Sequence, residues 1–259
     1  MRWLFSVAVL SLVTGSLQAE DTAAVKLADG FQCPVGSDGK GYYKARGMQP
    51  NGHLGEHWDG VGGGDTDLGA PVTATAHGLV LFARDFHLGW GNVIIVRHAY
   101  MEGAQVAYVD SLYGHLDQIL VREGEQVARG QKIGTIGNNH GMYPAHLHFE
   151  MRKNLRIGMA RSAFPRDYSC YWDPTQFVAA HARLEGGGRL AAVPINTFVA
   201  YRGPADLEAA TAQAGGVAPA RSPLTPLGTN PNAQPSATSR TKLRGFKVDP
   251  FEDMRNFGY

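Results

Sequence analysis

Short runs of β-prone residues separated by glycine are the feature that most constrains the fold of this sequence. Each run has the length of a strand, and the glycines stand where tight turns require positive φ. This pattern predicts a mostly β domain, which we expect to be a twisted antiparallel sheet with a groove along one face. The predicted strands are Val72 to Thr75, Leu79 to Ala83, Val93 to Val96, Ala107 to Leu112, Lys132 to Ile136 and His146 to Met151.

The segments on either side of this pattern differ in composition. The Gly and Lys content of residues 20–47 predicts little regular structure, so we expect this segment to be an irregular lead-in. Asp173, Pro174 and Gln176 provide a capping residue, a helix-compatible proline and a capping-box partner, which together predict one short C-terminal helix. Residues 185–259 are rich in Gly, Ala, Pro and Ser, which predicts a flexible, mostly disordered tail with a possible docking end at 246–259. The expected folded domain is therefore 48–184.

The first 19 residues have the layout of a secretory signal peptide. Arg2 precedes an apolar run from Trp3 to Val13 that is too short to span a bilayer, and small residues lead up to Ala19. We therefore expect a periplasmic or secreted protein, with an uncleaved membrane anchor as the alternative. Cys33 and Cys170 are the two cysteines of the chain, and an even pair in an exported protein predicts one disulfide, with two free thiols as the alternative.

The charge balance gives no sign of a nucleic-acid partner. The formal net charge of the 259 residues is +1, so the chain has no strong overall field. Its one basic cluster, from Arg240 to Lys247, lies in the predicted tail. Binding to nucleic acid is not expected.

Histidines at three places have the arrangement that a zinc hydrolase requires. His146 and His148 flank Leu147, and side chains at i and i+2 of a strand point to the same face. Both imidazoles are therefore expected in one cleft, where one can bind zinc and the other can handle a proton. His115 ends a predicted strand whose alternation places it on one face with Val109, Ser111 and Tyr113.

His53 and His57 form the third place. They are four residues apart, beside Gly55 and ahead of the glycine run 62–64, and this composition favours a loop or strand end over a helix. Glu56 does not complete a helical His-Glu-x-x-His zinc motif, because the order of the residues is wrong and Gly55 opposes a helix. We expect His98 to be a buried or rim histidine, and His77, His87, His140 and His181 to be surface residues outside the site.

Taken in order, these motifs resemble the LytM/lysostaphin family of zinc metallopeptidases. The resemblance covers about residues 52–152, and the segment from Asp173 to Phe177 is similar to the usual end of that domain. It is carried by His53 and the fourth residue after it, by the segments GAPV, YGHL and GEQVARGQKIG, and by the His-x-His pair.

The resemblance implies a role for each of these histidines. His53 and His148 would be zinc ligands, while His115 and His146 would position or deprotonate the attacking water and stabilise the oxyanion. The family normally has Asp where this chain has His57. Three histidines form an acceptable zinc shell, so we predict His57 as the remaining ligand, with Asp59 or an incomplete site as alternatives.

The resemblance and the export signal together imply a Zn2+-dependent endopeptidase that cuts stem or cross-bridge peptides of bacterial peptidoglycan. The alternative is a weakly active or inactive regulator that activates another cell-wall hydrolase, with the C-terminal tail as a possible contact to that enzyme or to an envelope protein. A secreted peptidase that acts on another protein also remains open. A biotinyl or lipoyl carrier domain is not expected, because no lysine lies between methionines at a hairpin tip.

Overall fold

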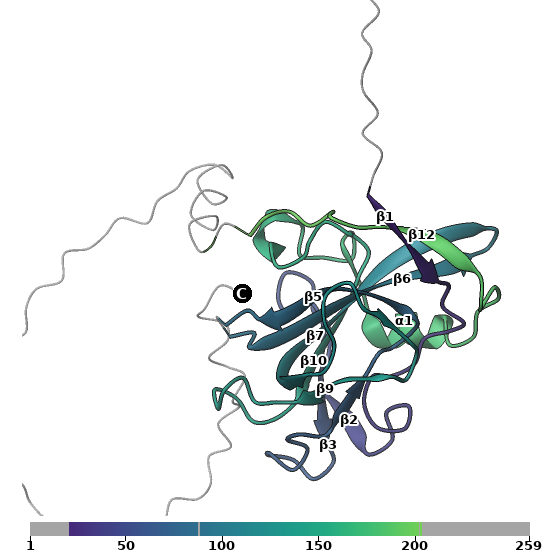
Figure 1. Cartoon of the computed structure of the whole chain (residues 1–259). Coiled ribbons are helices and arrows are strands. Elements are labelled where there is room, and N and C mark those ends of the chain that lie inside the picture. Colours follow the sequence, from purple (N-terminus) through teal and green to yellow (C-terminus); the bar gives the residue numbers. More distant parts are fainter. Residues whose placement is uncertain (1–20, 88, 202, 204–259) are drawn as a thin grey trace, which may run out of the picture.

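The computed structural model describes residues 21–87, 89–201 and 203, and this part of the chain is mostly β-structure (Figure 1). All of its strand pairings are antiparallel, and one short α-helix follows the large sheet. The predicted fold class is confirmed. The elements are β1 (Thr22–Lys26), β2 (Tyr42–Arg46), β3 (Glu56–Gly60), β4 (Pro71–Thr73), β5 (Gly78–Asp85), β6 (Asn92–Glu102), β7 (Gln105–Ile119), β8 (Gln126–Val127), β9 (Lys132–Ile136), β10 (Leu147–Arg152), the 3-10 turn η1 (Arg161–Ala163), β11 (Tyr171–Trp172), α1 (Pro174–Ala180) and β12 (Leu190–Pro194).

Within the described residues, ten strands make one sheet and β1 and β12 make a second. The main path of the large sheet is β2-β3-β10-β7-β6-β5-β8, while β11 joins β10, and β9 joins both β4 and β7. All six predicted strands are present, although β6 and β7 extend well beyond their predicted ends. The central position of β10, between β3 and β7, brings distant segments of the chain together.

Strand β10 separates the apolar core from a buried polar face. Leu147, Phe149 and Met151 pack in the main apolar core, whereas alternation turns His148, Glu150 and Arg152 to the other side. These three polar residues are also buried, at 0–3% exposure. Polar groups without water require internal partners, so this face must contain a hydrogen-bonded network.

The predicted irregular lead-in and disordered tail are wrong for the segments that form strands. β1 and β2 lie within residues 20–47, and β12 lies within residues 185–259. β1 pairs along its whole length with β12, and Val25 packs with Val193 against Leu79 and Ala99 of the large sheet. In Figure 1 this pair lies across the end of the large sheet near β6. Each strand pairs with a partner at the other end of the described domain, so the local sequence pattern does not reveal the pairing.

Helix α1 follows the prediction closely. The Asp173 side chain accepts a hydrogen bond from the Gln176 backbone N–H at 2.9 Å, and Pro174 occupies the first turn. Phe177 anchors the helix in the main core. Glu56 ties β3 to the same helix, since its Oε1 accepts hydrogen bonds from the backbone and hydroxyl of Thr175.

The predicted disulfide is wrong, because Cys33 and Cys170 are free thiols in this structure. Cys33 lies against the main core, whereas Cys170 belongs to a separate apolar cluster with Met48, Leu54 and Tyr171. Packing into different clusters explains why an even cysteine count gave the wrong expectation. Burial raises the pKa of the Cys33 thiol to about 11, so it stays protonated at neutral pH.

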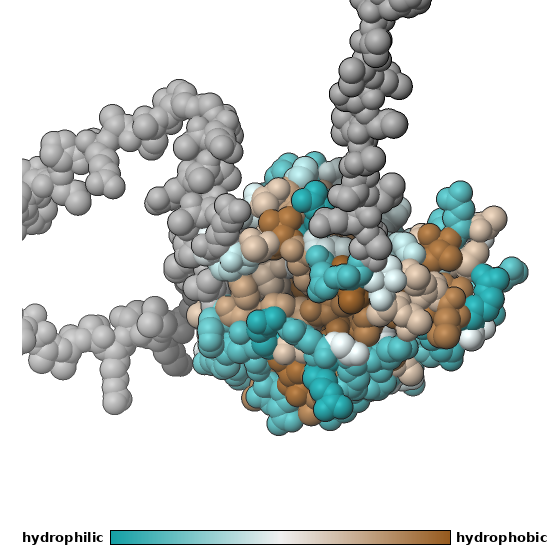
Figure 2. Space-filling model, turned by 45° about the horizontal axis from the view of Figure 1, so that its top comes forward, coloured by the Kyte–Doolittle hydropathy of each residue, from teal (hydrophilic) through white to brown (hydrophobic). Residues whose placement is uncertain are grey.

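Two other predictions fall outside the described residues. The signal peptide at 1–19 and the docking end at 246–259 both lie there. In the part of the chain that is described, no helix has the length and apolar composition to cross a bilayer. Figure 2 shows one face of the molecule, on which apolar side chains gather in several patches among hydrophilic ones.

Candidate metal centre

The structure brings all five sequence-predicted histidines into one buried group, called here the histidine cluster: His53, His57, His115, His146 and His148. His53 lies in the loop before β3 and His57 lies in that strand, opposite His148 of β10. His148 also pairs with Gly114 of β7, the residue before His115. Every member of the histidine cluster is at most 6% exposed.

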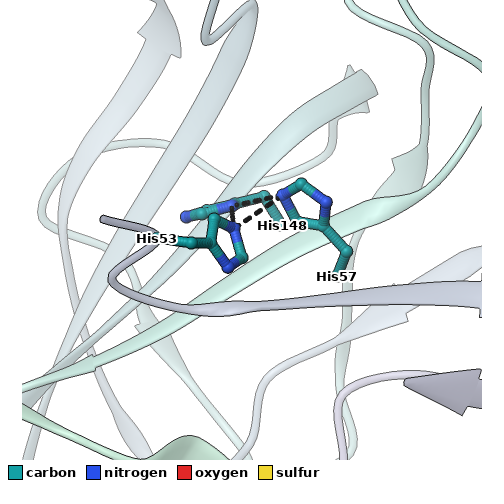
Figure 3. A group of neighbouring side chains, drawn as sticks. All are labelled: His53, His57 and His148. Carbon is teal, nitrogen blue, oxygen red and sulfur yellow. Dashed lines mark hydrogen bonds between the residues drawn. The ribbon is translucent and has the colours of Figure 1, made fainter. Parts of the chain in front are cut away.

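Three ring nitrogens of this cluster converge on one point (Figure 3). Nε2 of His53 lies 2.8 Å from Nε2 of His57 and 3.2 Å from Nδ1 of His148, and the last two atoms are 3.0 Å apart. Ligands at the usual zinc–nitrogen distance and tetrahedral angle would be about 3.3 Å apart. The three nitrogens are therefore slightly closer than a zinc ion would hold them, and they can accept one with a small expansion.

Hydrogen bonds on the far sides of two rings determine where the protons lie. Nδ1 of His53 is 3.0 Å from the carbonyl oxygen of Gly47, and Nε2 of His148 is 2.8 Å from Oε1 of Glu150. Both partners accept hydrogen bonds, so we assign the protons to Nδ1 of His53 and Nε2 of His148. The other nitrogen of each ring, Nε2 of His53 and Nδ1 of His148, then directs its lone pair at the other across 3.2 Å. A cation between them would satisfy both, so this donor set fits a metal ion.

A buried charge network supports His148. Glu150 is fully buried, and it accepts from His148 through Oε1 and from Nε of Arg152 through Oε2, the latter at 2.7 Å. Arg161 lies 3.9 Å from the same carboxylate. Burial opposes ionisation of Glu150, but Arg152, Arg161 and His148 outweigh it and hold the pKa of the carboxyl group below its usual range. The carboxylate therefore keeps its charge beside the ring of His148.

His115 and His146 form the second half of the cluster. Their ring centroids lie 4.9 Å apart, and the ring of His146 is 4.3 Å from that of His57. Nδ1 of His115 lies 3.2 Å from the Trp90 carbonyl, and Nδ1 of His146 lies 2.8 Å from the Pro144 carbonyl. Each ring is therefore assigned a proton on Nδ1 and a lone pair on Nε2. Among the described residues, the Nε2 atom of His115 is buried and has no hydrogen-bond partner, so it is a polar atom of the cluster that calls for a further partner.

The backbone turns His115 to a different face from the one that strand alternation predicts. Tyr113, two residues earlier, packs in the main core beside Phe149. His115 has φ of 61°, which interrupts the regular alternation of β7 and directs its ring to the face that carries His148. The predicted shared face of Tyr113 and His115 is therefore wrong, although His115 still reaches the cluster. A left-handed non-glycine residue at this position is a local strain that the surrounding fold holds in place.

Burial keeps the imidazoles of the cluster neutral. Desolvation, with the nearby His148, lowers the pKa of His53 to about 3, and desolvation also lowers that of His146 to about 4. Desolvation and the neighbouring imidazoles lower the pKa of His57 and His115 well below the ordinary value. Desolvation also lowers the pKa of His148, although the hydrogen bond and charge of Glu150 act in the opposite direction. Neutral imidazoles are the form that binds a metal ion.

The alternative ligand Asp59 lies outside this group. Its Oδ2 atom accepts a hydrogen bond from the hydroxyl of Tyr43 at 3.0 Å, and it is absent from the described sets of side chains that can share a metal ion. His98 is buried, as expected, and its ring lies between the carbonyl of His77 and the hydroxyl of Ser111. Of the predicted surface histidines, His87 and His140 are exposed, while His77 and His181 are partly buried.

Sequence reasoning missed the charged residues that support the cluster. Glu150 continues the i, i+2 series of His146 and His148, so the strand pattern already placed it on the same face. Arg152 extends that series by one more step. Trp90 had no such signal, because its carbonyl oxygen rather than its side chain holds His115.

The middle of the chain is similar to known proteins. The profile of "Peptidase family M23" matches residues 59–158. Lipoprotein NlpD of Yersinia enterocolitica is 44% identical over 84 residues, which is 32% of this chain and 78% of that protein. The murein hydrolase activator NlpD of Salmonella typhimurium is 42% identical over 32% of this chain and 20% of that protein. The peptidoglycan DD-endopeptidase ShyB of Vibrio cholerae is 38% identical over 33% of this chain and 18% of that protein.

Solved structures of peptidases are also similar to this chain. A zinc-containing peptidase from Vibrio cholerae has 30% identity and a TM-score of 0.38, with 48% of this chain and 37% of that chain covered. The catalytic domain of lysostaphin from Staphylococcus simulans has 23% identity and a TM-score of 0.38, with 53% of this chain and 92% of that chain covered. The match thus spans most of the Yersinia protein and of the lysostaphin domain, but about a fifth of the Salmonella NlpD protein and of ShyB.

Proposed function

This chain belongs to peptidase family M23, and we propose that it is an exported zinc-dependent endopeptidase that hydrolyses stem or cross-bridge peptides of bacterial peptidoglycan. One observation carries the proposal. The lone pairs of His53 Nε2 and His148 Nδ1 face each other 3.2 Å apart, and Nε2 of His57 lies within 3.0 Å of both. Three neutral nitrogens in this arrangement are a donor set that can share one cation, which supports a metal site.

In the proposed enzyme, His53, His57 and His148 hold the zinc ion. When bound, zinc polarises a peptide carbonyl and makes a water molecule acidic enough to attack it near neutral pH. Glu150 keeps Nε2 of His148 protonated, so that Nδ1 stays available to the metal, and Arg152 keeps Glu150 charged. The Gly47 carbonyl orients His53 in the same way.

His115 and His146 perform the proton and oxyanion work in this proposal. Each is oriented by a backbone carbonyl at Nδ1, and each is therefore assigned a lone pair on Nε2. A neutral imidazole with such a lone pair accepts the proton of the attacking water and later returns it to the leaving amine. The imidazolium form stabilises the negative oxygen of the tetrahedral species. Burial favours the neutral form before the reaction, which keeps both rings ready to accept.

The substrate class is supported by the relatives and by the predicted export signal. ShyB is described as a peptidoglycan endopeptidase, and NlpD is described as an activator of murein hydrolases, so both names refer to the cell wall. A signal peptide at 1–19 would deliver this chain to the compartment that contains that polymer. Periplasmic or secreted localisation is part of the same proposal.

The competing function is activation of another cell-wall hydrolase, and it is favoured by the similarity to the murein hydrolase activator NlpD of Salmonella. An activator needs the fold and a contact surface but no metal. The lone pairs assigned to Nε2 of His53 and Nδ1 of His148 lie 3.2 Å apart in a buried site, and such an arrangement is costly to retain without a ligand. This cost is the reason we place the enzyme first.

The test combines the metal content of the purified protein with the release of new amino groups from purified peptidoglycan. We expect one tightly bound zinc ion and cleavage, and we expect His148→Ala to lose both. His181→Gln is the matched control, because His181 also pairs with a carboxylate, at 3.1 Å from Glu102, but lies outside the histidine cluster. If the protein neither holds zinc nor cleaves peptidoglycan, but stimulates a separate amidase, it is an activator instead.

A further inference from the structure

A second group of possible ligands lies on the surface beside the histidine cluster. It consists of Asp85, His87 and His140, called here the rim cluster. Asp85 ends β5, His87 lies in the turn before β6, and His140 lies in the loop between β9 and β10. One ligand atom from each lies within 4.8 Å of the others. The side chains of His87 and His140 are 77% and 59% exposed, so solvent and dissolved ions reach both.

We propose that the rim cluster is a second metal site, which binds a divalent transition-metal ion such as zinc more weakly than the histidine cluster. Two imidazole nitrogens and one carboxylate oxygen are a donor set that zinc accepts, and water would complete the coordination. This proposal does not depend on the peptidase function. It concerns different side chains and a different part of the surface.

The distances favour a metal ion at this position. Oδ2 of Asp85 lies 3.0 Å from Nδ1 of His87 and 3.0 Å from Nε2 of His140. A tetrahedral ion would hold such atoms about 3.3 Å apart, and both carboxylate–imidazole distances are close to this value, while all three ligand atoms lie within 4.8 Å of one another. The other carboxylate oxygen accepts a hydrogen bond from the backbone N–H of His87 at 2.8 Å, which fixes the orientation of Asp85 before any ion arrives.

The backbone also holds the two histidines in the required positions. His87 and His140 both have φ of 57°, a conformation that residues other than glycine rarely adopt. Internal hydrogen bonds support each loop, from the backbone N–H of Trp90 to the carbonyl of His87 and from the backbone N–H of Gly141 to Oδ1 of Asn138. Both loops hold these backbone conformations by their own hydrogen bonds.

Binding at the rim cluster would connect two loops that border the histidine cluster. The β5–β6 turn contains Trp90, whose carbonyl holds His115. The β9–β10 loop contains Tyr143, whose ring centroid lies 5.3 Å from that of His115. A metal ion shared by Asp85, His87 and His140 would link these two loops directly. The rim site is therefore placed to stabilise the wall around His115.

The test counts zinc ions per chain by equilibrium dialysis of the full protein at a series of buffered free zinc concentrations. We expect two ions on the unaltered chain, a tight one and a weaker one. His140→Asn should keep the tight ion and weaken the other by at least about tenfold, the lower end of what loss of a supporting contact costs a metal site. Asparagine is chosen because it tolerates positive φ, and His87→Asn should give the same result.

Two further variants make the outcome specific. His181→Gln should still bind two ions, because its histidine–carboxylate pair has no third ligand among the described residues. His148→Ala should lose the tight ion and keep the weaker one, and it should show zinc-dependent shifts of the His87 and His140 ring signals by NMR. The rim site is overturned if His140→Asn binds as many ions as the unaltered chain, with the same affinities. If His148→Ala keeps the tight ion, the proposed function fails while the rim site is still decided by His140→Asn.

Discussion

The histidine cluster and the rim cluster use the same residue type in opposite environments. The members of the histidine cluster are at most 6% exposed, whereas the two histidine side chains of the rim cluster are 77% and 59% exposed. His148 is oriented by a buried carboxylate that Arg152 keeps charged, while His87 and His140 share one partly exposed Asp85. Convergence of ligands is common to both sites. We propose that burial and fixed protonation distinguish the site for chemistry from the site for exchangeable binding.

The largest difference between the two sites should appear in the rate of cleavage. We expect His115→Asn to reduce peptidoglycan cleavage by about 10²- to 10⁴-fold, the usual contribution of a general acid or base. Asparagine tolerates the positive φ of residue 115 but cannot take up a proton. Metal analysis and amino-group release should be measured on the same sample.

The matched comparison is His87→Asn, which changes a histidine of the rim cluster whose backbone φ is also positive. It should leave the cleavage rate within a small factor of the original. The contrast between the two sites is lost if both variants reduce cleavage equally, or if His115→Asn loses its zinc along with its activity.

Burial also predicts that the metal-free protein loses stability in acid. His146 has a folded-state pKa of about 4 against an ordinary value of 6.5, so the unfolded chain binds more protons between these limits. The free energy of unfolding therefore falls as the pH is lowered from 6.5 towards 4, by on the order of 3 kcal/mol for such a histidine. Above pH 6.5 this contribution to the pH dependence vanishes.

Urea unfolding of the zinc-free protein at several pH values measures this effect. Replacing His146 with Gln should make the dependence on pH shallower, because one buried neutral imidazole is removed. A free energy of unfolding that stays constant from pH 7 to pH 4 would show that burial does not control the protonation of the cluster.

The next largest effect is expected on zinc affinity when Glu150, the carboxylate that orients His148, is replaced. We expect Glu150→Gln to weaken zinc binding by about 10- to 100-fold, because an amide orients His148 less firmly and adds no charge. It also leaves the buried guanidinium of Arg152 without its countercharge, so the free energy of unfolding should fall as well. Zinc titration and urea unfolding separate these two results.

The control for this variant comes from another buried ion pair. Arg97 and Asp110 are both buried and their atoms lie 2.7 Å apart, but they do not contact the histidine cluster in any described hydrogen bond or ion pair. Asp110→Asn should therefore destabilise the fold without changing zinc affinity in the folded state. Equal zinc affinity in Glu150→Gln and in the unaltered protein would remove Glu150 from the account of the site.

The sequence predicted local features well and distant partnerships poorly. The strands and the Asp173 cap depend on neighbouring residues, and both were found where the pattern indicated. The resemblance to the LytM-type motif implied that five histidines gather, and strand alternation by itself predicted this only for His146 and His148. By contrast, β1 is stabilised by β12 from the far end of the domain, and the cysteines lie in clusters that no local pattern separates. His115 reached the cluster through a positive φ that alternation cannot express.

The smallest effect is expected for His57→Asp, which restores the residue that the LytM-type motif normally has at this position. Carboxylate oxygen is an accepted zinc ligand, so we expect zinc to be retained and cleavage to stay the same or rise. The added negative charge lowers the net charge of the metal shell, which should weaken its hold on product carboxylates. Zinc analysis and the effect of added product peptide on the cleavage rate measure both consequences.

Asp59→Asn is the control for His57→Asp, since Asp59 contacts Tyr43 rather than the cluster, and it should leave zinc in place. Loss of zinc in His57→Asp but not in Asp59→Asn would mean that an imidazole is required at position 57. Loss of zinc in Asp59→Asn alone would instead make Asp59 the ligand, and the loop before β3 would have to bind the metal in another register.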